Sequence, residues 1–211
     1  MPLLIDDLDI PALAHQVRWL EYRSTPFEVY ESQPILRVSL TLPNLSPSEV
    51  DPTFAMPAIL DSGHTPAFSI GQEDLQRCRD QARGIYPNSA WMFLATPVSV
   101  TNAGGQTSLV PRLAADIWIH SSRGGSYENW TTSYPQFRPI RLAQIGVVAY
   151  VDPRDYAAVP NPPIGQAYAD IGTTPGPRLP LIGLTAFRRA GFDLSIILKG
   201  RSSGKITVSY P

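Results

Sequence analysis

Residues 58–64, AILDSGH, carry the side chains in this 211-residue sequence whose types and spacing best suit chemistry. An apolar run leads directly into Asp61, and a carboxylate at the end of a buried strand is costly unless it is hydrogen-bonded or shares a proton. Ser62 can offer a hydroxyl to the neighbouring backbone. Gly63 permits close approach of another segment and can direct its amide N–H at the carboxylate.

Paired carboxylates are the chemistry that such a position suits. When two carboxyl groups lie about 3 Å apart they cannot both ionise, so one keeps a proton. The ionised group can then act as general base on a water molecule while the protonated group donates to a substrate carbonyl. The alternative for Asp61 is a turn-initiating residue whose carboxylate caps backbone N–H groups.

Two other chemistries fit this segment less well. Ser62 lacks the G-x-S-x-G context of a nucleophilic serine, and a serine triad needs a separately placed histidine and carboxylate. His64 together with His15 and His120 would make a metal trio, but their spacing matches no ligand pattern, so we expect no metal and no cofactor. For His64 itself, a plain loop residue is the alternative to a direct role.

The surrounding sequence predicts a mainly β fold that positions Asp61. The chain has 22 prolines and only 17% charged residues, which limits long helices. Alternating or apolar runs predict strands, and the turn TNAGGQT predicts one long hairpin over 93–120. Helices are expected over 9–22 and over 72–83, the second ended by Gly84. The segment 140–151 reads as one or two strands, 160–180 as an ordered loop, and the C-terminal part as strand, short helix, strand, turn and strand.

Two motifs in this order resemble the retropepsin-type aspartic proteases. AILDSG is similar to their active-site strand, which is apolar residues, Asp, Ser or Thr, then Gly. LPLIGLTAFRRAGFDLSI resembles their later element, which is an apolar pair, Gly, a variable residue, a short helix and a strand. The order of catalytic strand, helix, hairpin flap, strand and Leu-Ile-Gly element also agrees, over roughly residues 33–200.

The resemblance implies an acid-protease half-barrel with a few short helices and inserted loops. Such chains are half of an enzyme, so the single Asp-Ser-Gly here implies a homodimer that cleaves a peptide or protein substrate between two copies of Asp61. It implies support of the carboxylate by Ser62, Gly63 and His64, and packing behind the site by Leu181, Ile182 and Gly183. It also implies a flap whose tip holds Asn102, Gly104 and Gly105.

Residues 1–32 have no counterpart in the family and are expected to form an N-terminal extension of a helix plus a strand. A protease-like domain over 33–211 follows it. His64 stands where the family usually has a small residue such as alanine, and a charged imidazole there would lower the pKa of Asp61. His64 and the inserted loops motivate a second hypothesis, a non-catalytic peptide-binding or scaffold module with the same fold. A third is a β-rich carbohydrate-binding domain using exposed Trp and Tyr.

Composition excludes several other classes. The net charge is −1 with no basic run, so we expect no nucleic-acid binding. No apolar run reaches the ~18 residues of a membrane span, and the acidic N-terminus lacks signal-peptide features, so a cytoplasmic protein is expected. Cys78, the single cysteine, is expected to be a partly buried helix residue and Asp116 to face solvent. Trp91, Trp118 and Trp130 are expected in the core or at its rim, with a binding surface as the alternative.

Overall fold

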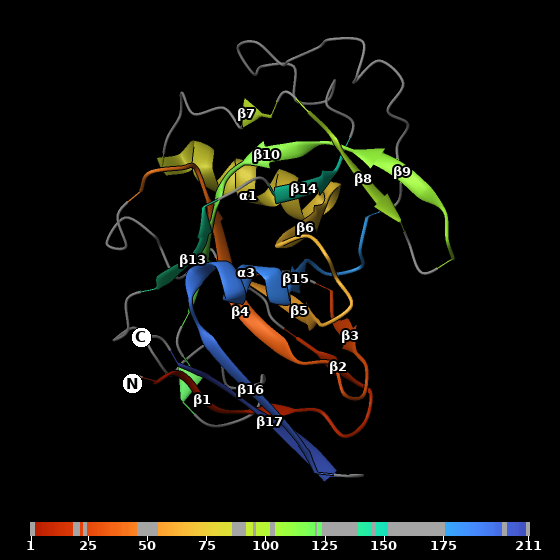
Figure 1. The fold of residues 1–211 in the computed structure, drawn as a ribbon, viewed down its shortest axis with the longest axis vertical. Coiled ribbons are helices and arrows are strands. Elements are labelled where there is room, and N and C mark those ends of the chain that lie inside the picture. The colour runs from red at the N-terminus through yellow and green to blue at the C-terminus, as the bar shows by residue number, and fades with distance from the viewer. Residues whose placement is uncertain are drawn as a thin grey trace.

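The computed structural model describes residues 3–18, 22, 25–45, 55–85, 92–94, 96–101, 104–120, 122–123, 139–144, 147–151, 176–199 and 202–209. This part of the chain is mainly β, with two short helices and a mixed half-barrel sheet (Figure 1). The predicted fold class is therefore confirmed at the level of a mainly β half-barrel.

The larger sheet has nine strands in the order β13-β11-β4-β5-β15-β6-β14-β10-β7. These are β4 (Ile35–Thr41), β5 (Met56–Asp61), β6 (Phe68–Gly71), β7 (Met92–Phe93), β10 (Arg112–Ala114), β11 (Asp116–Ile119), β13 (Ile140–Gln144), β14 (Val147–Tyr150) and β15 (Leu181–Gly183). Parallel pairs, β5 with β15 and β6 with β14, are mixed among antiparallel ones. The apolar run before Asp61 is thus a strand near the centre of this sheet, as predicted.

A smaller sheet joins the two ends of the described chain in the order β12-β1-β17-β16. Its strands are β1 (Leu3–Ile10), β12 (Ser122–Arg123), β16 (Asp193–Lys199) and β17 (Ser202–Ser209). Two hairpins complete the strands, formed by β2 (His15–Val17) with β3 (Phe27–Val29) and by β8 (Val98–Thr101) with β9 (Thr107–Val110). The N-terminal segment is therefore hydrogen-bonded directly to β17.

The two helices follow strands that lie close to Asp61. Helix α1 (Gln72–Ile85) begins where β6 ends, and its sequence is rich in residues that favour helices. The prediction over 72–83 is confirmed, although the helix runs through Gly84. Helix α3 (Leu184–Ala190) follows β15 and ends at Gly191, whose φ of 74° gives a left-handed cap. It lies between the two sheets and contacts β13, β15 and β16 (Figure 1).

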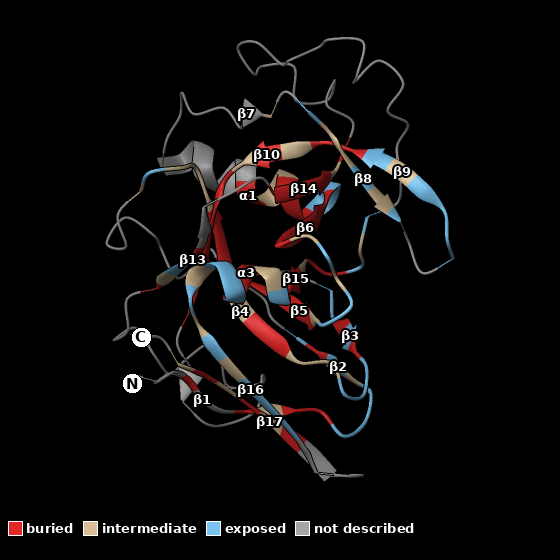
Figure 2. Ribbon diagram, viewed as in Figure 1, coloured by how far each residue is buried: buried red, intermediate tan, exposed pale blue. Residues whose placement is uncertain are grey.

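The core lies on the strands of the larger sheet and continues under β1 and β17 (Figure 2). All of the strand from Met56 to Leu60 is buried, which is expected for a central strand covered on both faces. Trp118 is also buried, and its indole N–H donates to the Thr41 hydroxyl at 2.8 Å. Trp118 is therefore a core residue, as expected, whereas Trp91 and Trp130 lie outside the described residues.

The predicted helix over 9–22 is wrong. Its first residues complete β1, and His15–Val17 pair with Val29 and Phe27 as a hairpin. Leu13, which such a helix would place on the same face as Val17, is 75% exposed, whereas Val17 is buried. The apolar spacing suited a helix, but pairing with β3 and β17 supplied backbone partners that the local pattern does not reveal.

The expectation that Asp116 faces solvent is also wrong. Asp116 begins β11, which lies between β4 and β13, and it is only 1% exposed. Its Oδ2 accepts a hydrogen bond from the backbone N–H of Asn44 at 3.1 Å and lies 3.5 Å from Nη1 of Arg141. A buried carboxylate with both partners is a structural anchor for the turn at Asn44, whose φ is 72°.

The predicted hairpin over 93–120 is shorter than expected. Pairing runs from β7 with β10 out to β8 with β9, and the chain then changes direction at Ala115. β11 leaves the hairpin to join β4 on the far side of the sheet. The segment 140–151 forms the two strands β13 and β14, and the C-terminal order of strand, helix, strand and strand is confirmed. Most of the predicted loop over 160–180 lies outside the described residues.

Candidate active site

Asp61 is the last residue of β5 and lies at the edge of the core, half-buried. Its Oδ1 accepts a hydrogen bond from the backbone N–H of Gly63 at 2.8 Å, and its carbonyl oxygen accepts one from the N–H of His64 at 3.1 Å. The first bond is the arrangement expected for Gly63 from sequence, and it is also the backbone cap that the alternative for Asp61, a turn-initiating residue, predicts. The turn thus holds the carboxylate of Asp61 in one orientation at the end of a rigid strand.

β15 lies between β5 and β6, and the loop that joins β5 to β6 passes over it. Leu181, Ile182 and Gly183 lie opposite Ile59, Leu60 and Asp61 in the parallel pairing. The same strand is antiparallel to β6 on its other side. This topology places the Leu-Ile-Gly segment beside Asp61, so the two sequence motifs that were separated by most of the chain lie side by side.

Gly183 is the residue that allows the loop to cross so closely. A Cβ atom at this position would lie 2.2 Å from the carbonyl oxygen of Pro66 and 2.3 Å from that of His64. Both distances are far shorter than the van der Waals contact distance of a Cβ atom. Both of the atoms that the Cβ would meet belong to the backbone. The backbone N–H of Gly183 also donates to the carbonyl oxygen of Ala67 at 3.1 Å. Glycine is therefore required here by packing and not by backbone conformation.

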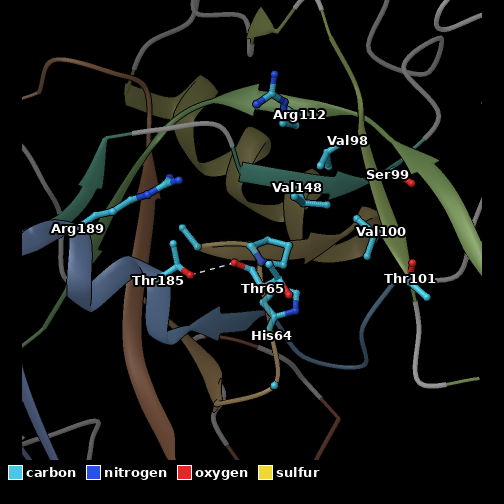
Figure 3. Close-up of a pocket in the computed structure, with 13 residues that line it drawn as sticks. His64, Thr65, Val98, Ser99, Val100, Thr101, Arg112, Val148, Thr185 and Arg189 are labelled. Atoms are coloured by element: carbon cyan, nitrogen blue, oxygen red, sulfur yellow. Dashed lines mark hydrogen bonds between the residues drawn. The ribbon is translucent and has the colours of Figure 1, made fainter. Parts of the chain in front are cut away.

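A side chain from α3 holds the same loop from the other side. The hydroxyl of Thr185 donates to the carbonyl oxygen of Thr65 at 3.1 Å (Figure 3). Together with the contacts of Gly183, this bond fixes the loop after Asp61 at consecutive backbone carbonyl groups. The orientation of Asp61 thus depends on β15 and α3 as well as on its own turn.

His64 points toward the interior of the site and bonds to a buried serine. Its Nε2 lies 2.8 Å from Oγ of Ser69, a residue of β6 that is fully buried. Burial lowers the pKa of His64, and the negative charge of Asp61 opposes this shift only in part. The imidazole is therefore neutral at pH 7, and the charged imidazole expected beside Asp61 would need an acidic solution.

A cavity of about 470 Å³ opens next to the loop (Figure 3). One wall is the loop after Asp61, with Gly63, His64 and Pro66, and a second is strand β8 of the hairpin. The remaining wall comes from β10, β14 and α3, which contribute Arg112, Val148, Thr185 and Arg189. Its volume lies within the range of small-molecule and side-chain pockets, about 300–1,000 Å³.

The hairpin β8–β9 borders the cavity. It projects beside the cavity, and Val98 to Thr101 line it (Figures 1 and 3). Gly104 and Gly105 are exposed at its tip, and Gly105 has a φ of 77° and enough open space that an added Cβ would meet no atom within 4 Å. Asn102, the third residue predicted at this tip, lies outside the described residues.

Ser62, in the turn after Asp61, is exposed.

Sequence reasoning missed several residues of this site. Ser69 on β6 and Arg112 on β10 form part of no recognisable motif, whereas Thr185 and Arg189 both come from α3. A threonine that lies two residues after a glycine is too common to indicate a function, and so is a serine inside a strand. Thr185 and Arg189 had an available signal, because both follow the Leu-Ile-Gly segment within the second motif.

The other titratable residues considered from sequence have structural roles. His120 is buried, and its Nε2 lies 2.7 Å from Oγ of Ser39. Cys78 is more deeply buried than expected, and burial raises the pKa of its thiol to about 12. In the part of the chain that the structure describes, no three His, Cys, Asp or Glu side chains lie together as metal ligands. None of the described helices is long and apolar enough to cross a membrane.

Comparison of the chain with protein-family models, curated proteins and solved structures gives no match. The geometry of the site is therefore the basis for a function.

Proposed function

We propose that the protein is an aspartic endopeptidase of the retropepsin type, in which two copies of the chain pair and each contributes Asp61 to one active site. The observation that carries the proposal is the position of Asp61. It ends a central strand, its Oδ1 is held by Gly63, and Gly183 lies opposite it under the crossing loop. The adjoining cavity and hairpin provide a place for a peptide and a cover for it.

A second chain is needed because one chain supplies one Asp-Ser-Gly. Asp61 itself does not line the cavity, whose described lining begins two residues later at Gly63 and holds no carboxylate. A two-fold axis that brings the two copies of Asp61 together would place their carboxyl groups close enough to share one proton. The oligomer is thus part of the proposed chemistry, since a single Asp61 cannot act as acid and base in the same step.

The reaction follows from that shared proton. The ionised Asp61 removes a proton from a water molecule as the water oxygen attacks the peptide carbonyl carbon, and the protonated copy donates its proton to the carbonyl oxygen. The Asp61 that took the proton from water then gives it to the leaving nitrogen as the C–N bond breaks, and the other Asp61 takes a hydroxyl proton from the tetrahedral diol, so that the pair again holds one proton. The amide of Gly63 keeps each carboxylate oriented throughout, and no metal or cofactor enters the proposal.

The test is Asp61→Asn, which keeps the size of the side chain and an acceptor for the Gly63 amide. Purified wild-type protein should cleave fluorogenic peptides from a broad library over a range of pH, and the variant should lose at least about 10³-fold in kcat/KM. Thr185→Val, which removes one bond to the loop but leaves Asp61, is the matched control and should lose much less. Retention of the rate by Asp61→Asn would show that the assignment is wrong.

The second candidate is a non-catalytic peptide-binding or scaffold module with the same architecture. His64 favours it, because this large side chain occupies the loop after Asp61 and lines the cavity that a substrate would enter. A pepstatin-type transition-state mimic separates the two functions. Tight binding that is lost in Asp61→Asn supports the peptidase, whereas absence of cleavage together with peptide binding that ignores Asp61 supports the module.

A further inference from the structure

The cavity beside Asp61 has an unusual distribution of charge. Its described lining residues include Arg112 and Arg189 and no aspartate or glutamate. The chain as a whole carries a formal charge of −1, so this concentration of positive charge does not follow from composition. His64 adds no charge at pH 7, because burial lowers its pKa.

The two arginines that line the cavity come from separate elements. Arg112 is half-buried on β10, and its Nε donates to the carbonyl oxygen of Thr96 at 2.9 Å. This bond fixes one edge of the guanidinium group and leaves the terminal nitrogens to serve as further donors. Arg189 extends from α3 toward the middle of the cavity (Figure 3). Arg189 is an exposed residue, so its guanidinium can adjust to a ligand.

The rest of the described lining mixes aliphatic and hydroxyl-bearing side chains. Aliphatic surface comes from Val98, Val100, Val148 and Ala67, and hydroxyl groups come from Thr65, Ser99, Thr101 and Thr185. A ligand group that suits the aliphatic surface and the two arginines has a short apolar stem and a terminal carboxylate, because guanidinium groups recognise carboxylates with paired hydrogen bonds. Among peptide side chains, glutamate has this form, and aspartate has it with a shorter stem.

We propose that this cavity is a subsite for an acidic side chain, and that the protein selects peptides with glutamate or aspartate near the bond that is cleaved. The inference rests on the proposed peptidase function and adds its substrate class. Arg112 and Arg189 are then specificity-determining residues, which bind the substrate without taking part in the proton transfers at Asp61.

The experiment uses the full-length protein and pairs of peptide pools. Each peptide is acetylated and amidated so that its chain ends carry no charge, and each pool places Glu or Gln at one position among otherwise uncharged residues. Wild-type protein should cleave the matching Glu pool about 5- to 20-fold faster than the Gln pool, as expected for a charge-assisted bond that is partly exposed. The preference should shrink as NaCl is added.

Variants of the arginines give the decisive comparison. Arg112→Gln combined with Arg189→Gln should bring the Glu-to-Gln ratio close to unity, whatever the absolute rate of the variant. Arg188→Gln is the matched control, because Arg188 is the exposed neighbour of Arg189 on α3 and does not line the cavity. It should keep the wild-type ratio. Circular dichroism of each variant verifies that the fold is kept.

The outcomes separate this inference from the peptidase proposal. Cleavage that depends on Asp61 but shows no Glu preference, or a preference that survives loss of both arginines, overturns the acidic subsite and leaves the peptidase. Fluorescence anisotropy with labelled pools provides a readout without cleavage. Binding of the Glu pool that depends on the arginines, with no cleavage, supports the subsite and overturns the peptidase. If the protein neither cleaves nor binds the pools, both the acidic subsite and the peptidase proposal are overturned.

Discussion

Gly183 lies directly opposite Asp61 in the parallel pairing of β5 with β15, and the loop that follows Asp61 crosses over it. This relationship connects the candidate catalytic carboxylate to a segment near the other end of the chain. The loop keeps its path only while position 183 has no side chain. The orientation of Asp61 is therefore a property of the tertiary fold and not of the Asp-Ser-Gly turn alone.

Gly183→Ala should strongly destabilise the protein. The added Cβ would meet two backbone carbonyl oxygens, so the loop or the strand must move. We expect the free energy of unfolding to fall by about 3 kcal/mol, measured by urea denaturation at one protein concentration. Gly63→Ala is the matched control, because its Cβ would lie at an ordinary distance of 3.4 Å from Oδ1 of Asp61. Equal stability of both variants would contradict the close crossing.

Replacement of His64 distinguishes the two proposed functions. The ring of His64 bonds to Ser69 and not to the carboxylate of Asp61, so its removal leaves the Gly63–Asp61 bond in place. The double variant His64→Ala with Ser69→Ala removes both hydrogen-bonding groups, so no buried polar group loses its partner. Its kcat/KM should stay within about threefold of wild type. If only this variant cleaves peptides and the wild type is inert, His64 has closed the site and the module is the better description.

The buried His120 should make the protein less stable in acid. Burial, aided by the positive charge of Arg37, lowers the pKa of His120 from 6.5 to about 3. Between these values the unfolded chain binds a proton that the folded protein rejects, so the free energy of unfolding falls as the pH falls. The slope contributed by this group is at most about 1.4 kcal/mol per pH unit. His64 contributes in the same direction, because its pKa is also lowered by burial.

His120→Gln isolates that contribution. Glutamine can replace Nε2 in the bond to Oγ of Ser39 but does not titrate. Urea denaturation at a series of pH values below 6.5 should show a shallower loss of stability for the variant than for wild type, and matching slopes above about pH 7. Identical slopes in acid would mean that His120 does not titrate as a buried neutral residue.

The tip of the β8–β9 hairpin should tolerate only residues that adopt a positive φ. Gly105 has a φ of 77° and open space around it, so a side chain is limited by backbone strain and not by packing. Valine there should lower kcat/KM about fivefold or more through a strained tip, with little effect on the unfolding midpoint. Asparagine, which accepts this conformation, should retain activity. Equal effects of Val and Asn would exclude the tip conformation as the cause.

The strand that carries Asp61 could be predicted because its signal is local. A short apolar run that ends in Asp-Ser-Gly has few structural interpretations, and helix α1 was recognisable from its own composition. The segment with Leu181–Gly183 was placed beside Asp61 through the resemblance of motifs. The contacts of Gly183 with the loop carbonyls, which explain why the placement works, are visible only in three dimensions.

The failed predictions share a physical cause. Residues 9–22 have apolar spacing that suits a helix, but they pair instead with β3 in a hairpin and with β17 near the other end of the chain. Asp116 looks like a surface residue until β4 and β13 cover it on both sides and Arg141 provides a counter-charge. The arginines of the cavity were missed for the same reason, because no spacing in the sequence relates Arg112 to Arg189.

Subunit mixing tests the shared active site most directly. Wild-type chains and Asp61→Asn chains are unfolded together in equal amounts and refolded, and peptide cleavage is compared with that of the same total amount of wild-type protein. If each active site needs Asp61 from two chains, random pairing leaves about one quarter of the activity, and light scattering gives the mass of a dimer. Activity of about one half, or an active species with the mass of one chain, would contradict a carboxylate pair formed between two copies.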